Sequence, residues 1–326
     1  MSMSTDFKGY LLSEFVEDYE QGQLTRRQAL KLLAGVTGSL ALANVLLTGC
    51  APESAPAPTM TLAFPSPAAV TSSTPTALPP TEEAPPTASA AGTYEPLAAG
   101  DIEFPGDGAT LLGHLARPSG AERRPAVLVC HENRGLTEHI KDVARRLASA
   151  GYVGLAVDLL SRIGGTSAVS DPADVPGILG NTPPEQFLSD FVSAWRWLQD
   201  QAYVLSDGVG MVGFCFGGGV TWRVAIGLAD VRAAVPFYGP HPDPSEVSTI
   251  QGAVLAIYAG NDERINQSIP AIEGAMQAAG RVYEKVVYPG VDHAFHNDTG
   301  SRYNAESATD AWARTLDWFG KYLATV

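Results

Sequence analysis

The sequence predicts an α/β protein in which a mostly parallel sheet is covered by helices on both faces. From about residue 94 to the C-terminus, short runs rich in valine, leucine and alanine alternate with longer helical stretches. This alternation is typical of repeated strand–helix–strand units, whose buried parallel strands are apolar throughout. The functional site of such a sheet lies beyond the carboxyl ends of the strands.

Seven strands and five helices are expected in this region. Short apolar runs predict the strands, whereas apolar residues spaced three and four apart predict the helices, as Phe187, Phe191, Trp195 and Leu198 do. The expected strands are 110–116, 125–130, 152–157, 208–214, 233–237, 254–258 and 282–288. The expected helices are 137–150, 185–201, 217–228, 268–279 and 303–323.

Charge and cysteine content exclude several classes of function. The 326 residues include 35 Asp and Glu against 21 Lys and Arg, a net charge of −14. Nucleic-acid binding favours a basic surface, so we expect no nucleic-acid partner. The three cysteines, Cys50, Cys130 and Cys215, are too few for a disulfide framework or a four-cysteine zinc site. No motif requires a metal or another cofactor, and we expect none.

Residues 1–50 resemble an export signal, and we expect them to lie outside the fold. Arg26 and Arg27 precede a mildly apolar run that ends at Leu47-Thr48-Gly49-Cys50. The arginine pair resembles a twin-arginine signal, and the last four residues resemble a lipobox, whose cysteine is acylated after cleavage. One alternative is a retained membrane anchor over residues 32–48, which glycines and polar residues dilute. The other is a cytoplasmic protein.

Residues 51–93 are expected to be a disordered spacer between this signal and the catalytic domain, residues 94–326. Ten of these 43 residues are proline, and Phe64 is the only aromatic one. Such a composition buries too little apolar surface to offset the entropy of ordering, and proline keeps the chain extended. We therefore expect an exported protein of the cell envelope, outside the cytoplasm, that meets the membrane only through a lipid on Cys50.

The motif most informative about chemistry is Gly213-Phe214-Cys215-Phe216-Gly217-Gly218-Gly219. It lies between an expected strand and an expected helix. A nucleophile elbow needs such a tight strand-to-helix turn, with glycines where side chains would collide and a nucleophile at its tip. The helix N-terminus behind Cys215 favours a thiolate and a developing oxyanion. The alternative is a buried cysteine beside a glycine-rich loop.

A nucleophile needs a base, and the base needs an orienting acid. In the hydrolase fold that uses this elbow, both follow the nucleophile in the chain, the acid first. Asp262 follows one expected strand and His293 follows the next, so we assign them as acid and base. His296 is the competing base, and a turn residue is the alternative for Asp262.

Residues 94–326 resemble the dienelactone hydrolase family of α/β-hydrolases. The resemblance rests on four segments taken together: GFCFGG, GNDERI, DHAF and HENRG. It implies the α/β-hydrolase fold, a triad of Cys215, His293 and Asp262, and a glutamate at Glu132 that interacts with the thiol and helps to generate the thiolate. The alternative for Glu132 is a helix cap or an ion pair with Arg134.

Two backbone N–H groups are expected to form the oxyanion hole. They are those of Phe216, directly after the nucleophile, and of Asn133, in the loop after an earlier strand.

Substrate recognition is assigned to one arginine. The segment DLLSR matches the position of a family arginine that binds an anionic substrate, so Arg162 is expected to pair with a substrate carboxylate. A second family arginine has no counterpart, because its place holds Pro270. The alternative for Arg162 is a solvated loop residue.

These residues predict a hydrolase of small ester or lactone substrates that acts through an acyl-enzyme. Two other functions remain open. One is a broader carboxylesterase or thioesterase on the same triad, and the other is a non-catalytic surface binding protein on a degenerate hydrolase fold.

Overall fold

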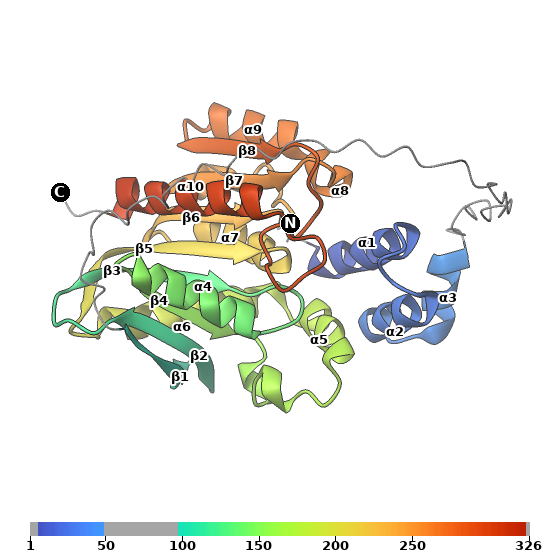
Figure 1. Ribbon diagram of the computed structural model, residues 1–326, viewed down its shortest axis with the longest axis horizontal. Coiled ribbons are helices and arrows are strands. Elements are labelled where there is room, and N and C mark those ends of the chain that lie inside the picture. Colours follow the sequence, from blue (N-terminus) through green and yellow to red (C-terminus); the bar gives the residue numbers. More distant parts are fainter. Residues whose placement is uncertain (1–5, 49–96, 324–326) are drawn as a thin grey trace, which may run out of the picture.

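The computed structural model describes residues 6–48 and 97–323 (Figure 1). Within these residues, eight strands form one sheet in the order β1-β2-β4-β3-β5-β6-β7-β8. β1 pairs antiparallel with β2 and β2 with β4, and the remaining pairs are parallel. The strands are β1 (Leu97–Gly106), β2 (Ala109–Pro118), β3 (Arg124–Cys130), β4 (Val153–Asp158), β5 (Val204–Phe214), β6 (Val231–Phe237), β7 (Ala253–Ala259) and β8 (Tyr283–Tyr288).

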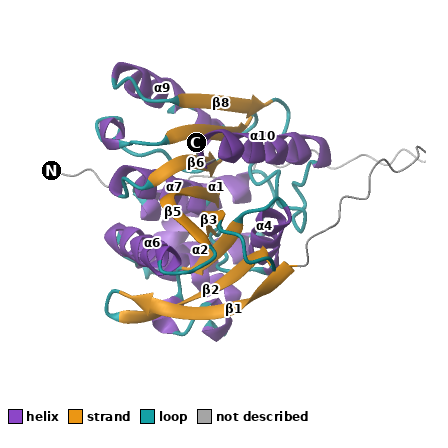
Figure 2. Cartoon of the chain, turned by 90° about the vertical axis from the view of Figure 1, so that its left-hand side faces the viewer, coloured by secondary structure: helices purple, strands orange, loops and turns teal. Residues whose placement is uncertain are grey.

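Helices cover both faces of the sheet, as the sequence predicts (Figure 2). One face carries α4 (Glu138–Ser149) and α10 (Ala305–Leu323). The opposite face carries α6 (Pro184–Gln199), α7 (Phe216–Gly227) and α9 (Ile269–Ala278). All seven predicted strands and all five predicted helices are present, with differences only at their ends. The predicted α/β architecture, a mostly parallel sheet with helices on both faces, is therefore confirmed, and β1 is the one described strand that was not predicted.

The expectation that residues 1–50 lie outside the fold is wrong for the described part of that segment. Residues 6–48 form three helices, α1 (Phe7–Glu20), α2 (Arg26–Thr37) and α3 (Leu40–Thr48), which we call the N-terminal helical segment. Figure 1 shows these helices together at one end of the sheet, near α5 (Val175–Asn181) and α8 (Glu263–Asn266). Cys50 and the expected spacer 51–93 lie outside the described residues.

Local sequence explains where these helices begin and end. Asp6 accepts a hydrogen bond from the Gly9 N–H at the start of α1. Thr25 and Gln28 form a reciprocal capping box at the start of α2, which satisfies backbone donors that the helix itself leaves free. Gly38 ends α2 in the left-handed conformation, with φ of 72°.

An apolar stripe on α1 explains why the segment packs against the domain. Phe7, Leu11 and Phe15 are buried on one face of α1. The Phe7 ring lies 4.8 Å from the ring of Phe216 and 5.6 Å from that of Phe187. Burial of large apolar side chains stabilises such a contact by about 1.5–3 kcal/mol each.

The backbones of α2 and α5 come into close contact. A Cβ atom added at Gly177 would lie 2.6 Å from the carbonyl oxygen of Gly35, so only glycine fits at this point of α5. Asn181 Nδ2 donates to the Val36 carbonyl nearby at 3.3 Å. Ion pairs join the segment to the domain at the sites Lys31–Asp171, Arg302–Asp18 and Arg264–Glu17.

The run considered as a membrane anchor is divided between two helices in the structure. Gly38 and Ser39 separate α2 from α3. Among the described residues, no helix has both the length and the apolar character needed to cross a bilayer.

Candidate active site

Cys215 lies at the tip of a sharp turn between β5 and α7. Its φ of 57° and ψ of −121° are rare for a residue with a side chain. Close packing requires the glycines around it. A Cβ added at Gly213 would lie 2.2 Å from the carbonyl oxygen of Gly217, and one added at Gly217 would lie 2.5 Å from the carbonyl oxygen of His131. The predicted nucleophile elbow is therefore the local structure at Cys215.

His293 and Asp262 are brought together as acid and base require. Asp262 follows β7 and caps α8, where its Oδ1 accepts from the Ile265 N–H at 3.3 Å. Its other oxygen, Oδ2, lies 2.6 Å from His293 Nδ1. Both side chains are buried, with relative exposures of 2% and 8%. This pairing leaves Nε2 of His293 directed toward the nucleophile, the arrangement of a base oriented by a carboxylate.

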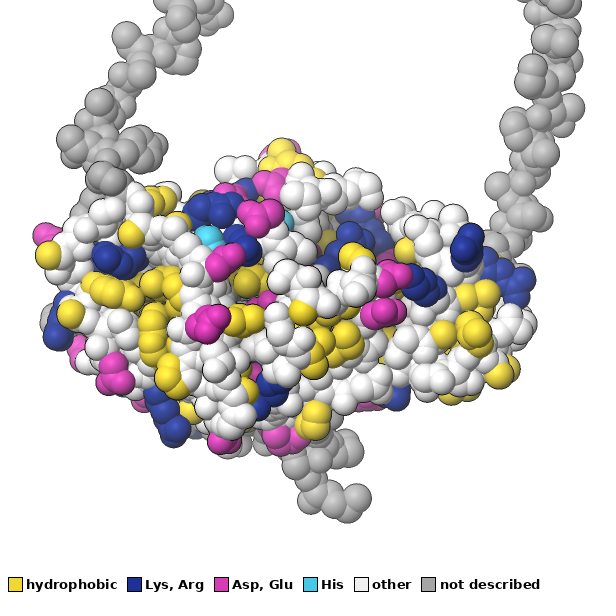
Figure 3. Space-filling view, turned by 90° about the horizontal axis from the view of Figure 1, so that it is seen from below, with side chains coloured by type: hydrophobic (Ala, Val, Ile, Leu, Met, Phe, Trp, Pro, Cys, Tyr) yellow, Lys and Arg dark blue, Asp and Glu magenta, His cyan; other side chains and the backbone are white. Residues whose placement is uncertain are grey.

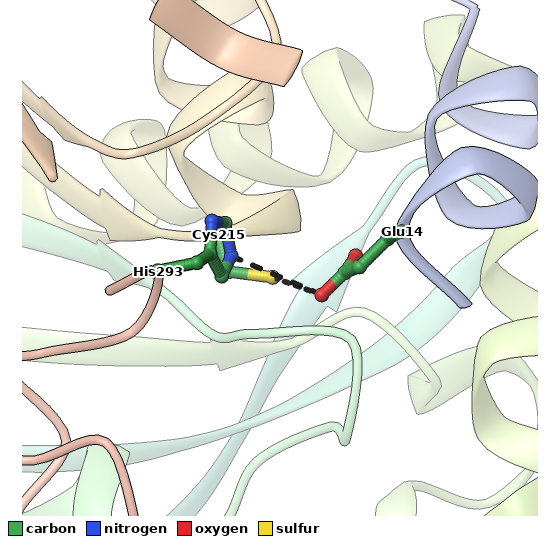
Figure 4. Close-up of side chains that lie close together, drawn as sticks. All are labelled: Glu14, Cys215 and His293. Carbon is green, nitrogen blue, oxygen red and sulfur yellow. Dashed lines mark hydrogen bonds and ion pairs between the residues drawn. The ribbon is translucent and has the colours of Figure 1, made fainter. Parts of the chain in front are cut away.

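The thiol of Cys215 contacts two residues of the N-terminal helical segment. Its Sγ atom donates a hydrogen bond to Glu14 Oε1 at 3.4 Å and lies 3.3 Å from the hydroxyl oxygen of Tyr10. The same Glu14 oxygen lies 3.8 Å from His293 Nε2. Figure 4 shows Glu14 reaching from α1 toward Cys215 and His293.

Electrostatics distinguish the nucleophile from the acid–base pair. Burial raises the pKa of the Cys215 thiol, and the neighbouring Glu14 carboxylate raises it further. Burial lowers the pKa of His293, but the charge and hydrogen bond of Asp262 have a larger, opposite effect. The pKa of His293 is therefore well above its ordinary value. Burial likewise raises the pKa of Asp262, yet the charge and hydrogen bond of His293 bring it below its ordinary value.

Glu132 is buried near the site but does not make the thiol contact that the resemblance implies. Its Oε2 atom accepts a hydrogen bond from Asn297 Nδ2 at 2.7 Å. Burial raises the pKa of this carboxyl group, and nearby His139 and Arg134 act in the opposite direction. Of the two carboxylates, Glu14 is the one in contact with Cys215.

The two residues expected to supply oxyanion donors both lie next to the candidate site. Phe216 begins α7 directly after Cys215, and Asn133 follows β3 in the loop that borders the site. The side chain of Asn133 also contacts the N-terminal helical segment, because Nδ2 donates to Glu14 Oε1 at 3.2 Å.

His296, the competing base, lies among aromatic rings and has no hydrogen bond to a carboxylate of the described residues. Its ring stacks on Phe214 at 5.0 Å between centroids, and burial lowers its pKa to about 3. A histidine that stays neutral in this way contrasts with the carboxylate-paired His293, which is the better candidate.

In the structure, Arg162 forms an ion pair with Asp190. One guanidinium nitrogen donates to Asp190 Oδ1 at 2.8 Å, and Asp190 lies fully buried on α6. Burial raises the pKa of Asp190, and the Arg162 charge counteracts this rise. Arg162 does not line the cavity beside Cys215. The ion pair favours a structural role, in place of the predicted contact with a substrate carboxylate.

Replacing Arg162 with alanine is expected to destabilise the protein without selective loss of activity. The change leaves Asp190 buried without its cation, which costs about 3 kcal/mol for a broken buried pair. Thermal unfolding and kcat/KM on anionic and neutral esters measure the two effects. Arg196→Ala, an exposed position on the same helix as Asp190, is the control. A selective loss on anionic substrates would restore the substrate-binding role.

A cavity of about 720 Å³ opens beside Cys215 and His293. The loops that follow β3 and β4 supply part of its wall, together with residues 294–302. The N-terminal helical segment supplies much of the rest, through Glu14, Phe15, Gln28, Lys31 and Leu32. A cavity of this size fits a small organic substrate.

The face of the molecule seen from below carries charges of both signs. Figure 3 shows Lys and Arg side chains interspersed with Asp and Glu and with hydrophobic patches. On α3, Leu40, Leu42 and Val45 are exposed, with relative exposures of 70%, 49% and 64%.

Two residues that contact Cys215, Glu14 and Tyr10, were not predicted from the sequence. The signal that identifies them is the spacing of Phe7, Leu11 and Phe15, which defines a buried face of α1 shared by both residues. The local sequence does not show which residues this face contacts, because Glu14 and Cys215 are 201 positions apart.

Glu14, Cys215 and His293 bring a carboxylate oxygen, a thiol and an imidazole nitrogen within 4.8 Å of one another. Groups of these kinds also hold zinc in proteins. Because His293 is paired with Asp262 and Cys215 occupies an elbow, we interpret the cluster as a nucleophile and base in contact with a third residue. The reaction proposed below needs no metal.

The fold and this arrangement define an α/β-hydrolase. Residues 111–323 match the dienelactone hydrolase family, and the chain belongs to that family. It is an enzyme of the carboxylic ester hydrolase kind.

The comparison with known proteins covers the catalytic domain. A "Putative carboxymethylenebutenolidase" of Methylorubrum extorquens is 34% identical over 238 residues, which are 69% of this chain and 82% of that protein. A protein of the same description from Escherichia coli K12 is 33% identical over 239 residues, covering 69% of this chain and 88% of its own. The solved structure of a "Putative Dienelactone Hydrolase" from Klebsiella pneumoniae is 32% identical, with a TM-score of 0.65 over 70% of this chain and all of its own.

Proposed function

We propose that the protein hydrolyses ester or lactone bonds of small molecules through a Cys215–His293–Asp262 triad and an acyl-enzyme. The observation that carries this proposal is the elbow at Cys215, with a buried His293 held by Asp262 at 2.6 Å beside it. A cavity of about 720 Å³ opens beside the thiol, and the loops after β3 and β4 form part of its wall.

The reaction follows from the chemistry of these groups. His293 takes the proton of Cys215, and the thiolate adds to the substrate carbonyl to form a tetrahedral intermediate. The backbone N–H groups of Phe216 and Asn133 stabilise its oxyanion, at about 3 kcal/mol of barrier for each donor. The carbon–oxygen bond of the leaving group then breaks, and His293 returns the proton to the departing oxygen.

Water completes the turnover in a second addition to the same carbonyl. His293 removes a proton from the water, whose oxygen bonds to the acyl carbon. The thioester bond breaks, the sulfur leaves as the thiolate and takes a proton back from His293, and the acid product departs. Asp262 keeps Nδ1 of His293 protonated and stabilises the imidazolium in both halves of the cycle.

The acyl-enzyme itself tests the proposal. After rapid mixing with p-nitrophenyl acetate and an acid quench, peptide mass spectrometry is expected to find an acetyl group on Cys215 and a burst of p-nitrophenol. Steady release without an adduct, at a rate unchanged by Cys215→Ala, would contradict covalent catalysis.

We propose in addition that the protein is exported and carries a lipid on Cys50. The sequence supports this through Arg26-Arg27, the run Leu47-Thr48-Gly49-Cys50 and the proline-rich residues that follow. Mass spectrometry of the membrane fraction is expected to find a mature N-terminus at an acylated Cys50, and Cys50→Ala is expected to block processing. An unmodified chain that starts at Met1 and occurs only in the cytosol would contradict it.

A further inference from the structure

Helix α1 places one of its own carboxylates inside the catalytic site. Glu14 is 6% exposed, and its Oε1 atom lies 3.4 Å from Cys215 Sγ, 3.8 Å from His293 Nε2 and 3.2 Å from Asn133 Nδ2 (Figure 4). Its other oxygen, Oε2, is buried without a hydrogen-bond partner in the described structure. A carboxylate buried in this way is costly, so its position calls for an explanation.

The Glu14 carboxyl group occupies the place that the substrate carbonyl must take. A carbonyl attacked by Cys215 lies against Sγ, within reach of His293 Nε2 and beside the loop that contains Asn133. Glu14 meets all three of these groups. A carboxylate is also the acid product of ester hydrolysis, so Glu14 resembles bound product in both position and chemistry.

Contact with Glu14 keeps the nucleophile in its unreactive form. The thiol donates its proton to the Glu14 carboxylate oxygen, and Nε2 of His293 faces the same oxygen at 3.8 Å. A neighbouring negative charge disfavours a thiolate, which is the reactive species. Tyr10, at 3.3 Å from the sulfur, covers the thiol from the same helix.

The rest of the N-terminal helical segment holds Glu14 in place. Phe7, Leu11 and Phe15 are no more than 4% exposed, and Glu17 and Asp18 on the same helix pair with Arg264 and Arg302 of the domain. Because the segment belongs to the same chain, its effective concentration at the site is high, and a substrate must compete with it.

We propose that the N-terminal helical segment is an intramolecular inhibitor of the hydrolase, with Glu14 bound where the acid product would lie. This inference rests on the proposed function in one respect: the reaction that the segment blocks is the proposed ester hydrolysis. The proposed cleavage before Cys50 would then activate the enzyme, because loss of residues 1–49 removes all three helices and uncovers Cys215.

The test measures two properties of the full-length chain: the rate at which iodoacetamide alkylates Cys215, and kcat/KM for p-nitrophenyl acetate. Glu14→Ala keeps a good helix former at position 14 and removes the carboxylate. Both quantities are expected to rise at least about 10-fold, the effect of removing a contact of about 1.4 kcal/mol. Glu20→Ala, an exposed glutamate on the same helix, is the matched control and should change neither.

A second variant loosens the segment and leaves Glu14 intact. In Gly177→Val, the new side chain collides with the Gly35 carbonyl of α2, and both rates are expected to rise as in Glu14→Ala. Gly274→Val is the control, because a Cβ at Gly274 in α9 meets nothing within 4 Å. Circular dichroism and thermal unfolding establish that the domain stays folded in each variant.

Three results overturn one proposal or the other. Unchanged alkylation and hydrolysis in both Glu14→Ala and Gly177→Val would overturn inhibition by the segment. A fall in hydrolysis in Glu14→Ala would make Glu14 a catalytic residue and overturn it as well. Faster alkylation with no ester hydrolysis in any variant would support occlusion of Cys215 and overturn the proposed function.

Discussion

Cys215→Ala is expected to lower kcat/KM for p-nitrophenyl acetate by at least about 10⁴-fold, as removal of a covalent nucleophile does. The reason is that no other described side chain occupies the elbow opposite the His293–Asp262 pair. Cys215→Ser is expected to lose activity too, because a hydroxyl gives far less of the reactive anion than a thiol does. Measurement in the native and in the Glu14→Ala background separates loss of the nucleophile from inhibition by α1.

Cys130→Ala provides the control for this prediction. Cys130 is a second buried free thiol at the end of β3, and burial holds its pKa well above the ordinary value. Its removal should change kcat/KM less than about 3-fold, within the range of a small packing effect. If activity survived in Cys215→Ala but not in Cys130→Ala, the nucleophile would be Cys130 and not Cys215.

Asp262→Asn is expected to lower kcat/KM by about 10²- to 10⁴-fold, the range that positioned proton transfer contributes. The amide cannot stabilise the His293 imidazolium and favours the wrong tautomer of the ring. Asp292→Asn is the matched control, since this exposed carboxylate is adjacent to His293 but pairs with Asn261 instead. A similar loss in both variants would mean that Asp262 is not the orienting acid.

The same pair predicts a pH window for stability. The lowered pKa of Asp262 makes its contribution complete above the ordinary value of 3.8, and that contribution is lost as the pH falls through the folded-state pKa. The raised pKa of His293 makes its contribution complete below 6.5, and that contribution is lost as the pH rises through the folded-state pKa. The unfolding free energy of the native protein minus that of Asp262→Asn should therefore be largest between pH 3.8 and 6.5.

Chemical denaturation across the pH range measures this difference. It is expected to decline on both sides of the window, more gradually on the alkaline side. A difference that does not vary with pH would mean that the two groups do not interact as ions in the folded protein.

The parallel part of the sheet was predictable because its strands carry their signal locally. β3, β4 and β7 are buried on both faces and therefore consist of continuous apolar runs. β1 was not predictable in this way, since it is a largely exposed edge strand whose sequence includes Gly100, Asp101 and Pro105. Its position depends on antiparallel pairing with β2.

The grouping of the three candidate catalytic residues was predictable, and the side chains around them were not. Cys215, Asp262 and His293 each follow a strand, so the topology of the sheet brings them to one edge. Glu14 and the Arg162–Asp190 pair depend on which helices pack together over long separations in sequence. Because residues 1–50 resemble an export signal, they were expected to lie outside the fold, and the helix that carries Glu14 was not predicted.

The contact between Glu14 and Cys215 has a consequence for the order in which the molecule is completed. α1 leaves the ribosome before any strand exists, yet its docking surface includes His293 and Arg302, near the end of the chain. A 14-residue helix is marginally stable in isolation, and two domain partners of its apolar face, Phe187 and Phe216, come far later in the chain. Residues 7–20 can therefore complete their contacts with the domain only after Arg302 has been made. Glu14 can meet both Cys215 and His293 only after β8, which precedes His293, has been made.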